Sequence, residues 1–535
     1  MIPTARTPAW AADNGDGTYR NPVLHADWSD PDVVRAGRDF YLVASSFHRA
    51  PGLPLLHSRD LVNWSILGHA LPSLEPDDVF GTPQPGCGVW APALRHHDDR
   101  FWIFYPDPDR GIFVTTARDP AGEWSRPSLL KGGRGLIDPC PLWDEDGSAY
   151  LVHAWAKSRA GFNNRLTCHR MSSDATELLD EGRTVIDGDS LPGYRTLEGP
   201  KFYRRDGWYY IFAPAGGVAD GWQSVFRSRE VFGPYEERVV LAQGDTPVNG
   251  PHQGAWVTTA EGQDWFLHFQ DKGPFGRVVH LQPLRWQPDG WPVIGASGAP
   301  VPSHAKPAVA SPSAPGAPAD GDDFAGTGVG PQWSWAANPR PGWLSVRPGE
   351  GPELKCAASD VDGDLRRLPN LLGQRLPSDR FRAATTMRLT GADTIGARAG
   401  LAVVGRTYAW IGLVSTVDGV HLVHRTAMAG EAEREAAPPV LVPVDADGTS
   451  VTVAVGVDVD PDGRCGFFAA IDGAAPRPFG EPFTSTAGHW VGATLGVFAT
   501  APTGRETAAT ARMSAFEVTG RSPQRTDATR GTDRG

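Results

Sequence analysis

Three acidic residues stand beside prolines at matching places in the first 200 residues of the chain. They occur as Asp30-Pro31, Asp138-Pro139 and Glu198-Gly199-Pro200. Two carboxyl groups that face each other across a sugar-sized gap can hydrolyse a glycosidic bond, one as acid and the other as base or nucleophile. Asp30 and Glu198 are the candidates for this pair. A third carboxyl group near the acid would raise the pKa of the acid by like-charge repulsion, and Asp138 is placed to do so.

The alternative is that these acids only begin turns, because aspartate caps turns and proline fixes φ. Their shared position in a repeat argues against this interpretation. The same phrase recurs as Trp90-Ala91-Pro92, where an aromatic residue takes the place of the acid. Asp27 and Asp32 flank Asp30 but do not hold its place in the repeat, so we interpret them as supporting polar groups.

Each of these four motifs precedes an aromatic residue by eleven or twelve positions. The aromatic residues are Tyr41, Trp102, Tyr150 and Tyr210, and a looser copy, His252-Gln253-Gly254, precedes Phe266. Self-similarity at a period of roughly 50–60 residues, with turn residues before each aromatic run, is typical of a β-propeller. If the copies are equivalent blades, the acids begin the innermost strands and converge on the propeller axis. Later in the repeats, Trp64, Trp124 and Tyr235 are expected to plug the gaps between neighbouring blades.

The rest of the chain predicts a second β domain. Its 535 residues, 40% of them apolar, exceed what one core usually fills. Alternating runs after residue 321, with no helix-period stretch, predict a β-sandwich. The expected order is an N-terminal extension (1–18), a five-bladed β-propeller (19–295), a linker rich in Ala, Pro, Ser and Gly (296–321), the sandwich (322–520) and a disordered tail (521–535).

The overall composition excludes several classes of partner. A net charge of −12 and a pI near 5.7 argue against nucleic acid and anionic membranes, and favour a neutral or cationic ligand. The five cysteines contain no C-x-x-C pair, so neither a disulfide framework nor a zinc site is predicted. Neither an apolar leader core nor a run of about 18 apolar residues occurs, so we expect a cytoplasmic protein, or a secreted one if a signal was removed. The sequence leaves the oligomeric state open.

The motifs together resemble a known family. Asn21-Pro22-Val23-Leu24, Ser29-Asp30-Pro31-Asp32-Val33, Trp90-Ala91-Pro92, Ile137-Asp138-Pro139 and Leu197-Glu198-Gly199-Pro200 look like glycoside hydrolase family 43, in particular its β-xylosidases and α-L-arabinofuranosidases. The resemblance spans about Tyr19 to Ile294, and the sandwich resembles the C-terminal domain of those xylosidases, which implies a concanavalin A-like jelly roll.

The resemblance implies a role for each acid: Asp30 as general base, Asp138 as the group that modulates pKa and Glu198 as general acid, with inversion at the anomeric carbon. It also implies that Arg277 reaches sugar hydroxyls. His252 matches the family's channel histidine, with one extra residue before the following valine. No cofactor is expected to be required, although some members bind calcium at that histidine. Where the family commonly has an acid after Trp-Ala-Pro, this chain has Ala93.

Six aromatic residues near the acids are candidates for a platform against which a sugar packs. Trp90, Phe47 and Trp155 are predicted to bind substrate, and Trp28, Trp222 and Trp256 complete the set, of which two or three are expected to touch ligand. The predicted function is an exo-acting, inverting hydrolase that releases xylose from β-1,4-xylo-oligosaccharides. The alternatives are an α-L-arabinofuranosidase and a non-catalytic carbohydrate-binding propeller.

Overall fold

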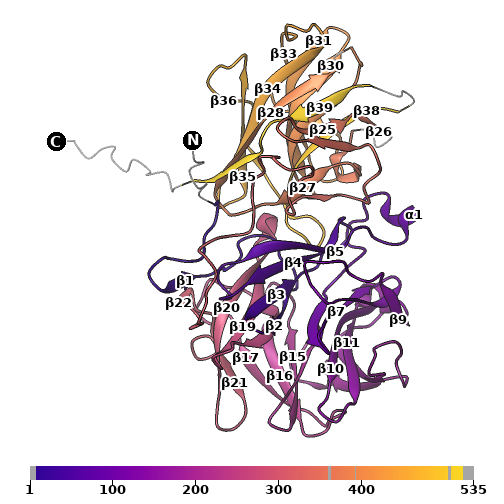
Figure 1. Ribbon diagram of the computed structural model, residues 1–535, viewed down its shortest axis with the longest axis vertical. Coiled ribbons are helices and arrows are strands. Elements are labelled where there is room, and N and C mark those ends of the chain that lie inside the picture. Colours follow the sequence, from indigo (N-terminus) through magenta and orange to yellow (C-terminus); the bar gives the residue numbers. More distant parts are fainter. Residues whose placement is uncertain (1–7, 360–362, 392, 504–507, 522–535) are drawn as a thin grey trace, which may run out of the picture.

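The computed structural model describes residues 8–359, 363–391, 393–503 and 508–521. Two all-β units follow each other along the chain and stack on one another (Figure 1). The first, coloured indigo to pink, is a propeller, and the second, coloured orange to yellow, is a sandwich that covers one end of it. None of the helices in the described residues is long and apolar enough to cross a membrane.

Five antiparallel sheets of four strands each form the propeller, and every sheet is made of consecutive strands. Blade 1 comprises β2 (Asp32–Ala36), β3 (Asp39–Val43), β4 (Gly52–Ser58) and β5 (Ser65–Leu71). Blade 2 comprises β6 (Ala93–His97), β7 (Arg100–Asp107), β8 (Gly111–Ala117) and β9 (Ser128–Gly132). Blade 3 comprises β10 (Leu136–Trp143), β11 (Ala149–Trp155), β12 (Arg165–Met171) and β13 (Arg183–Asp187). Blade 4 comprises β14 (Lys201–Arg205), β15 (Trp208–Ala215), β16 (Trp222–Ser228) and β17 (Glu236–Leu241). Blade 5 comprises β18 (His252–Thr258), β19 (Asp264–Asp271), β20 (Arg277–Trp286) and β21 (Pro292–Ile294).

The strand registers explain the repeat seen in the sequence. Tyr41 pairs with Val34 across β2 and β3, and Tyr150 pairs with Leu142 across β10 and β11. Each aromatic residue therefore lies on the second strand of its blade, while the acid or its counterpart stands at the beginning of the first strand. The predicted five-bladed propeller is confirmed, and equivalent residues do occupy equivalent places.

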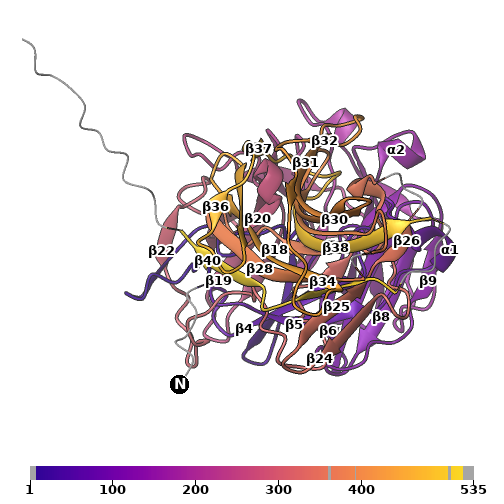
Figure 2. The same ribbon diagram turned by 90° about the horizontal axis from the view of Figure 1, so that it is seen from above.

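Two sheets of nine strands each form the sandwich. One sheet contains β23 (Ser334–Trp335), β26 (Ala357–Ser359), β27 (Leu372–Arg375), β29 (Arg398–Val404), β30 (Tyr408–Thr416), β31 (Gly419–Ala427), β32 (Arg434–Glu435), β33 (Val440–Leu441) and β38 (Thr494–Pro502). The other contains β24 (Leu344–Arg347), β25 (Gly351–Lys355), β28 (Phe381–Thr390), β34 (Ser450–Val459), β35 (Arg464–Ile471), β36 (Arg477–Pro478), β37 (Phe483–Thr484), β39 (Thr510–Met513) and β40 (Glu517–Gly520). Figure 2 shows these curved strands from above, lying over the propeller. The core between the sheets is aliphatic and aromatic, and it includes Phe324, Trp333, Trp335 and Trp343.

Helical structure is confined to single turns. They are α1 (Asp77–Phe80), α2 (Lys157–Ala160) and the 3-10 turns η1 (Gly188–Ser190), η2 (Gly273–Phe275) and η3 (Leu365–Arg367). Within the stretch predicted as a linker, β22 (Ser303–Ala305) pairs with β1 (Thr18–Arg20), so this segment runs along the propeller. Of the tail predicted as disordered, residues 522–535 lie outside the described residues.

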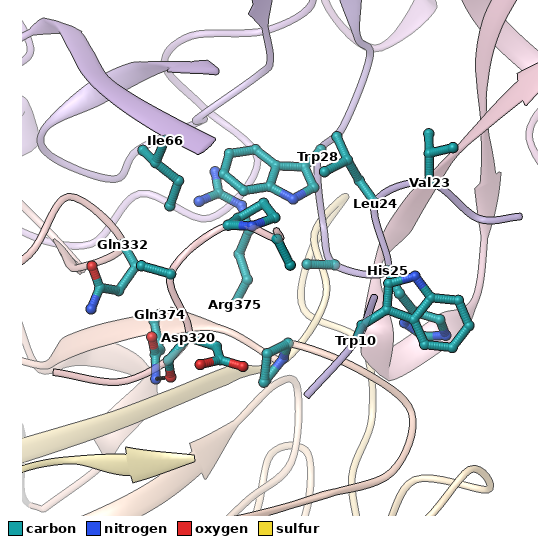
Figure 3. Close-up of a pocket in the computed structure, with 15 residues that line it drawn as sticks. Trp10, Val23, Leu24, His25, Trp28, Ile66, Asp320, Gln332, Gln374 and Arg375 are labelled. Carbon is teal, nitrogen blue, oxygen red and sulfur yellow. Dashed lines mark hydrogen bonds between the residues drawn. The ribbon is translucent and has the colours of Figure 1, made fainter. Parts of the chain in front are cut away.

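The two units share a polar interface. Ala50 and Trp335 exchange both backbone hydrogen bonds, at 2.6 and 3.2 Å. The guanidinium of Arg375 lies 4.0 Å from the ring centre of Trp28 and donates to the carbonyl of Asp27 at 2.6 Å. Figure 3 shows this contact beside a hollow of about 40 Å³ between the units, which none of the three candidate acids lines.

Candidate active site

The three candidate acids meet in one pocket at the end of the propeller that faces the sandwich. Asp30 directly precedes Pro31 and β2, Asp138 lies in β10, and Glu198 stands three residues before β14. The pocket encloses about 80 Å³. Its remaining lining residues come from both units: Phe47, Trp90, Ala91, Ile137, Gln253, Arg277 and Trp490.

Backbone strain is concentrated in this pocket. Asp30 and Asp138 have φ angles of 55° and 54°, and Phe47, Gln253 and Trp490 have φ angles of 52°, 38° and 65°. Residues with a Cβ seldom adopt such angles, and each instance costs about 1–3 kcal/mol unless its surroundings enforce it. Half of the residues that line the pocket therefore have an unfavourable backbone conformation, which directs their side chains into the pocket and lowers local stability.

Asp30 is held as a hydrogen-bond acceptor. It accepts from Arg277 Nη1 at 2.7 Å and from the hydroxyls of Ser45 at 2.6 Å and Ser29 at 3.1 Å. Arg277 comes from β20, so this ion pair joins blade 5 to blade 1. A buried carboxylate that is oriented by a cation and two hydroxyls suits the role of a fixed base for a water molecule.

Arg277 is itself a buried charge that depends on its acidic neighbours. Burial opposes its charged form, but the carboxylates of Asp30, Asp271 and Asp27 outweigh this effect and raise the pKa of Arg277. The predicted sugar-binding arginine therefore lines the pocket and also orients the predicted base.

Asp138 and Glu198 form a second carboxyl pair, contributed by blades 3 and 4. Asp138 accepts from the backbone N–H of Gly199 at 2.8 Å, which fixes it next to the Glu198 segment. Burial raises the pKa of Asp138, and the nearby Glu198 carboxylate raises it further. Two negative charges on this pair at the same time are therefore unfavourable, so one of the two carboxyl groups tends to keep a proton. An acid catalyst needs such a proton.

Glu198 differs from the other two acids in its exposure. Its side chain is 25% exposed, whereas that of Asp30 is 6% exposed. Glu198 Oε1 lies 3.0 Å from Nε2 of the buried His252, which starts β18. Glu198 is therefore the acid that a ligand in the pocket can reach most easily, and His252 of blade 5 fixes its position. Both properties suit a group that donates a proton to a leaving group.

The predicted aromatic platform is only partly assembled. Phe47 and Trp90 line the pocket. Trp155 lies outside it, where its indole N–H donates to Thr167 Oγ1 at 2.9 Å. The remaining three also lie elsewhere: Trp28 under Arg375 at the interface, Trp222 against Tyr194, and Trp256 against Tyr203.

One residue of the pocket has no sequence signal that pointed to it, and a second lies in the looser copy of the repeat without being singled out. Trp490 belongs to the sandwich, and its ring centre lies 6.2 Å from that of Trp90. Gln253 follows His252 directly but could be assigned only once the backbone direction at β18 was known. The motifs that identify the acids carry no information about a loop almost 300 residues further along the chain.

The flanking acids predicted as supporting groups do different things. Asp27 accepts from the backbone N–H groups of Arg277 and Gly492, both at 2.9 Å, and so joins the propeller to the sandwich. Asp32 is fully buried and pairs with Arg95 at 2.8 Å and Lys201 at 3.4 Å. This second cluster stabilises the centre of the propeller and does not line the catalytic pocket.

The described residues offer no preformed cage for calcium. Calcium requires six to eight oxygen ligands, and within the described part of the chain no group of three or more His, Cys, Asp or Glu side chains could hold a metal ion. His252 Nε2 is engaged by Glu198. The donor set at this histidine therefore does not fit a bound calcium ion held by side chains.

Comparisons with known proteins identify the family of each unit. The family model for glycosyl hydrolases family 43 matches residues 19–292, and the model for the β-xylosidase C-terminal concanavalin A-like domain matches residues 321–519. A β-xylosidase of Formosa agariphila is 31% identical over 93% of this chain and 90% of its own length. A non-reducing end α-L-arabinofuranosidase of Bacteroides ovatus is 30% identical over 67% of this chain and 68% of its own.

Among solved structures, a family 43 protein from Bacillus licheniformis has the same fold. It superposes with a TM-score of 0.80 at 24% identity and covers 94% of this chain and all of its own. Three carboxyl groups converge on one propeller pocket, and the family models match both units in order. The chain therefore belongs to glycoside hydrolase family 43 and is a glycoside hydrolase.

Proposed function

We propose that this protein is an exo-acting β-xylosidase that hydrolyses β-1,4-xylo-oligosaccharides with inversion at the anomeric carbon. The observation that carries the proposal is the asymmetry of the two outer acids: Asp30 is buried and ion-paired with Arg277, whereas Glu198 is partly exposed beside His252. The name of the Formosa agariphila relative supports xylose as the released sugar.

In the proposed reaction Glu198 gives its proton to the glycosidic oxygen as the bond from that oxygen to the anomeric carbon breaks. Asp30 removes a proton from a water molecule, which attacks the same carbon from the opposite face. Asp30 and Glu198 line the same pocket from blades 1 and 4, and the proposal places this water between them. Arg277 holds the base, and Asp138 favours the protonated state of the pair that it forms with Glu198.

Two features support an exo mode of action. The pocket is small, at about 80 Å³, and Trp490 lies beside Trp90 at its wall. A pocket of this kind suits one terminal sugar better than the interior of a chain.

A panel of substrates tests the proposal. We expect kcat/KM for an aryl β-D-xyloside to exceed that for the matching α-L-arabinofuranoside at least tenfold, and xylotriose to yield xylose and xylobiose first. The reverse order would establish the arabinofuranosidase alternative, which the Bacteroides ovatus relative favours. No turnover of either substrate would indicate a non-catalytic carbohydrate-binding propeller.

Replacing the proposed acid tests its role. Glu198→Gln removes the proton donor, so kcat should fall by about 10²–10⁴-fold on xylobiose and far less on an aryl xyloside whose leaving group needs little protonation. Equal losses on both substrates would remove Glu198 from this role.

The configuration of the released sugar tests the role of Asp30. Proton NMR of a fresh wild-type reaction on a β-xyloside should show α-xylose first, because a general base directs water to the opposite face of the sugar. If β-xylose appears first, Asp30 is a nucleophile.

A further inference from the structure

A hollow lies between blades 1 and 2, separate from the catalytic pocket and from the hollow in Figure 3. It encloses about 320 Å³, and none of the three catalytic acids lines it. The wall between the two spaces is a β-bridge from Phe47 to Val89, with N···O distances of 2.8 and 3.0 Å. Phe47 lines the catalytic pocket, and Val89 lines the hollow between blades 1 and 2.

This hollow exists because one blade junction is not plugged. Trp64 and Trp124 occupy the same turn in blades 1 and 2, and each donates its indole N–H to a nearby backbone carbonyl. Trp64 is 2% exposed and fills its junction as predicted. Trp124 is only partly buried, and its ring forms a wall of the hollow.

The lining offers flat apolar surfaces. Tyr105 and Phe113 are cross-strand partners on β7 and β8, and their rings stack with centres 5.6 Å apart and planes 17° apart. Phe80 of α1 and Trp124 add further aromatic surface. Aromatic faces of this kind pack against the C–H face of a sugar ring.

Polar groups that suit hydroxyl ligands project into the same space. Tyr105 is 6% exposed and lines the hollow, and its hydroxyl has no hydrogen-bond partner among the described residues. This hydroxyl is therefore available to a ligand or to water in the hollow, as a donor and as an acceptor. Burial and the carboxylates of Asp107 and Glu75 raise the pKa of Tyr105, which keeps the hydroxyl a donor.

The charges of the hollow are balanced. Asp107 pairs with Arg110, and Glu75 accepts two hydrogen bonds from Arg126, at 2.9 and 3.1 Å. Glu75 and Arg126 are both largely exposed, which places their ion pair at the mouth. A balanced site gives no advantage to a cation or an anion, and it provides both donors and acceptors for a neutral polyhydroxy ligand.

From these observations we infer that the hollow between blades 1 and 2 is a second carbohydrate site, which binds a neutral pyranose unit of a xylose-containing chain. Tyr105 and Phe113 provide the stacking surface, and the Tyr105 hydroxyl, Asp107 and the Glu75–Arg126 pair bind sugar hydroxyls. The choice of a xylose chain rests on the proposed function, whereas the existence of the site does not.

Affinity electrophoresis through gels that contain soluble neutral arabinoxylan tests the site on the full chain. Tyr105→Phe removes the hydroxyl alone, and Trp124→Ala removes one wall. We expect each variant to lose at least two-thirds of the retardation shown by the wild type, while kcat/KM on an aryl β-xyloside stays within twofold. Trp208→Ala, at the start of β15 in blade 4 and under Arg229, is the control and should be retarded like the wild type.

The possible outcomes separate the site from the proposed function. If both variants fold, as judged by their Tm, and migrate like the wild type, the second site is refuted. If the wild type turns over no xyloside but is retarded through Tyr105 and Trp124, the site stands and the proposed function fails. If Trp124→Ala does not fold, Tyr105→Phe decides alone.

Discussion

Asp138 is the residue at which the proposed chemistry depends most on its surroundings. It is buried, it accepts a hydrogen bond from Gly199, and it stands next to Glu198. Burial and this neighbour both raise the pKa of Asp138. Asp138 therefore keeps its proton at a pH at which an exposed aspartate has lost it, and a negative charge on Asp138 beside the Glu198 carboxylate is unfavourable. That repulsion is the means by which a residue that need not touch substrate can control an acid catalyst.

Asp138→Asn should change how stability depends on pH. An unfolded aspartate releases its proton near pH 4, whereas folded Asp138 retains it, so the contribution of Asp138 to the free energy of unfolding falls as pH rises above about 4. Asparagine cannot ionise, so this loss is absent from the variant. The Tm of the variant minus that of the wild type should become more positive from about pH 5 to about pH 8, as measured by thermal unfolding. A difference that does not change with pH would mean that Asp138 ionises normally.

The elements that carry the acids are the first strands of the blades and the turns before them. Gly199, between Glu198 and Pro200, has a φ of 59°, and a Cβ placed there would lie 2.9 Å from the side chain of Gln253. The turn can therefore hold Glu198 at the pocket only with glycine, because any side chain would push against blade 5. The same geometry lets the Gly199 N–H reach Asp138.

Gly199→Ala should reduce kcat/KM at least tenfold, because it displaces the segment that carries the acid and also costs about 1–2 kcal/mol for an unfavourable φ. Gly147→Ala is the matched control, since Gly147 also has a positive φ, 85°, but no atom lies within 4 Å of its added Cβ. The control should lose similar stability and keep its activity. If both variants lose activity equally, the contact with Gln253 is not what matters.

At the scale of the whole molecule, the sandwich is part of the catalytic unit. Asp27 links the backbone of Arg277, which holds the base, to the backbone of Gly492, two residues from Trp490. Burial raises the pKa of Asp27, and these two N–H groups oppose that effect. Phe275 of the propeller is buried in the sandwich core. The two units therefore share hydrogen bonds at the pocket and apolar core beneath it.

Asp27→Asn should raise KM at least threefold on aryl xylosides with a smaller change in kcat. An amide can accept through one oxygen only, so one of two buried N–H groups loses its partner, at a cost of about 1–3 kcal/mol. Asp379→Asn tests specificity, because Asp379 also joins the units, but through ion pairs with His25 and Lys272 instead of the backbones of Arg277 and Gly492. An unchanged KM in the Asp27 variant would show that the Trp490 loop is held by other contacts.

Deleting the chain after Pro300 should give insoluble or inactive protein. The deletion exposes the buried side chains of Phe275 and Trp28 and removes Trp490 from the pocket. Expression followed by gel filtration and an aryl xyloside assay checks this. A soluble propeller with wild-type kcat/KM would establish that the sandwich is a detachable accessory.

The sequence by itself determined the propeller, the sandwich and the three acids. Blades repeat because none can bury its faces alone. Asp30, Asp138 and Glu198 hold the same position in this repeat, so one sequence is enough to identify them. The tertiary structure decided which other residues join them. Trp155 is close to the acids in sequence yet points elsewhere, while Trp490 reaches the pocket from the sandwich. Packing in three dimensions determines the contacts between the two units and the incomplete filling of the blade junction by Trp124. Such packing leaves no periodic pattern in the sequence.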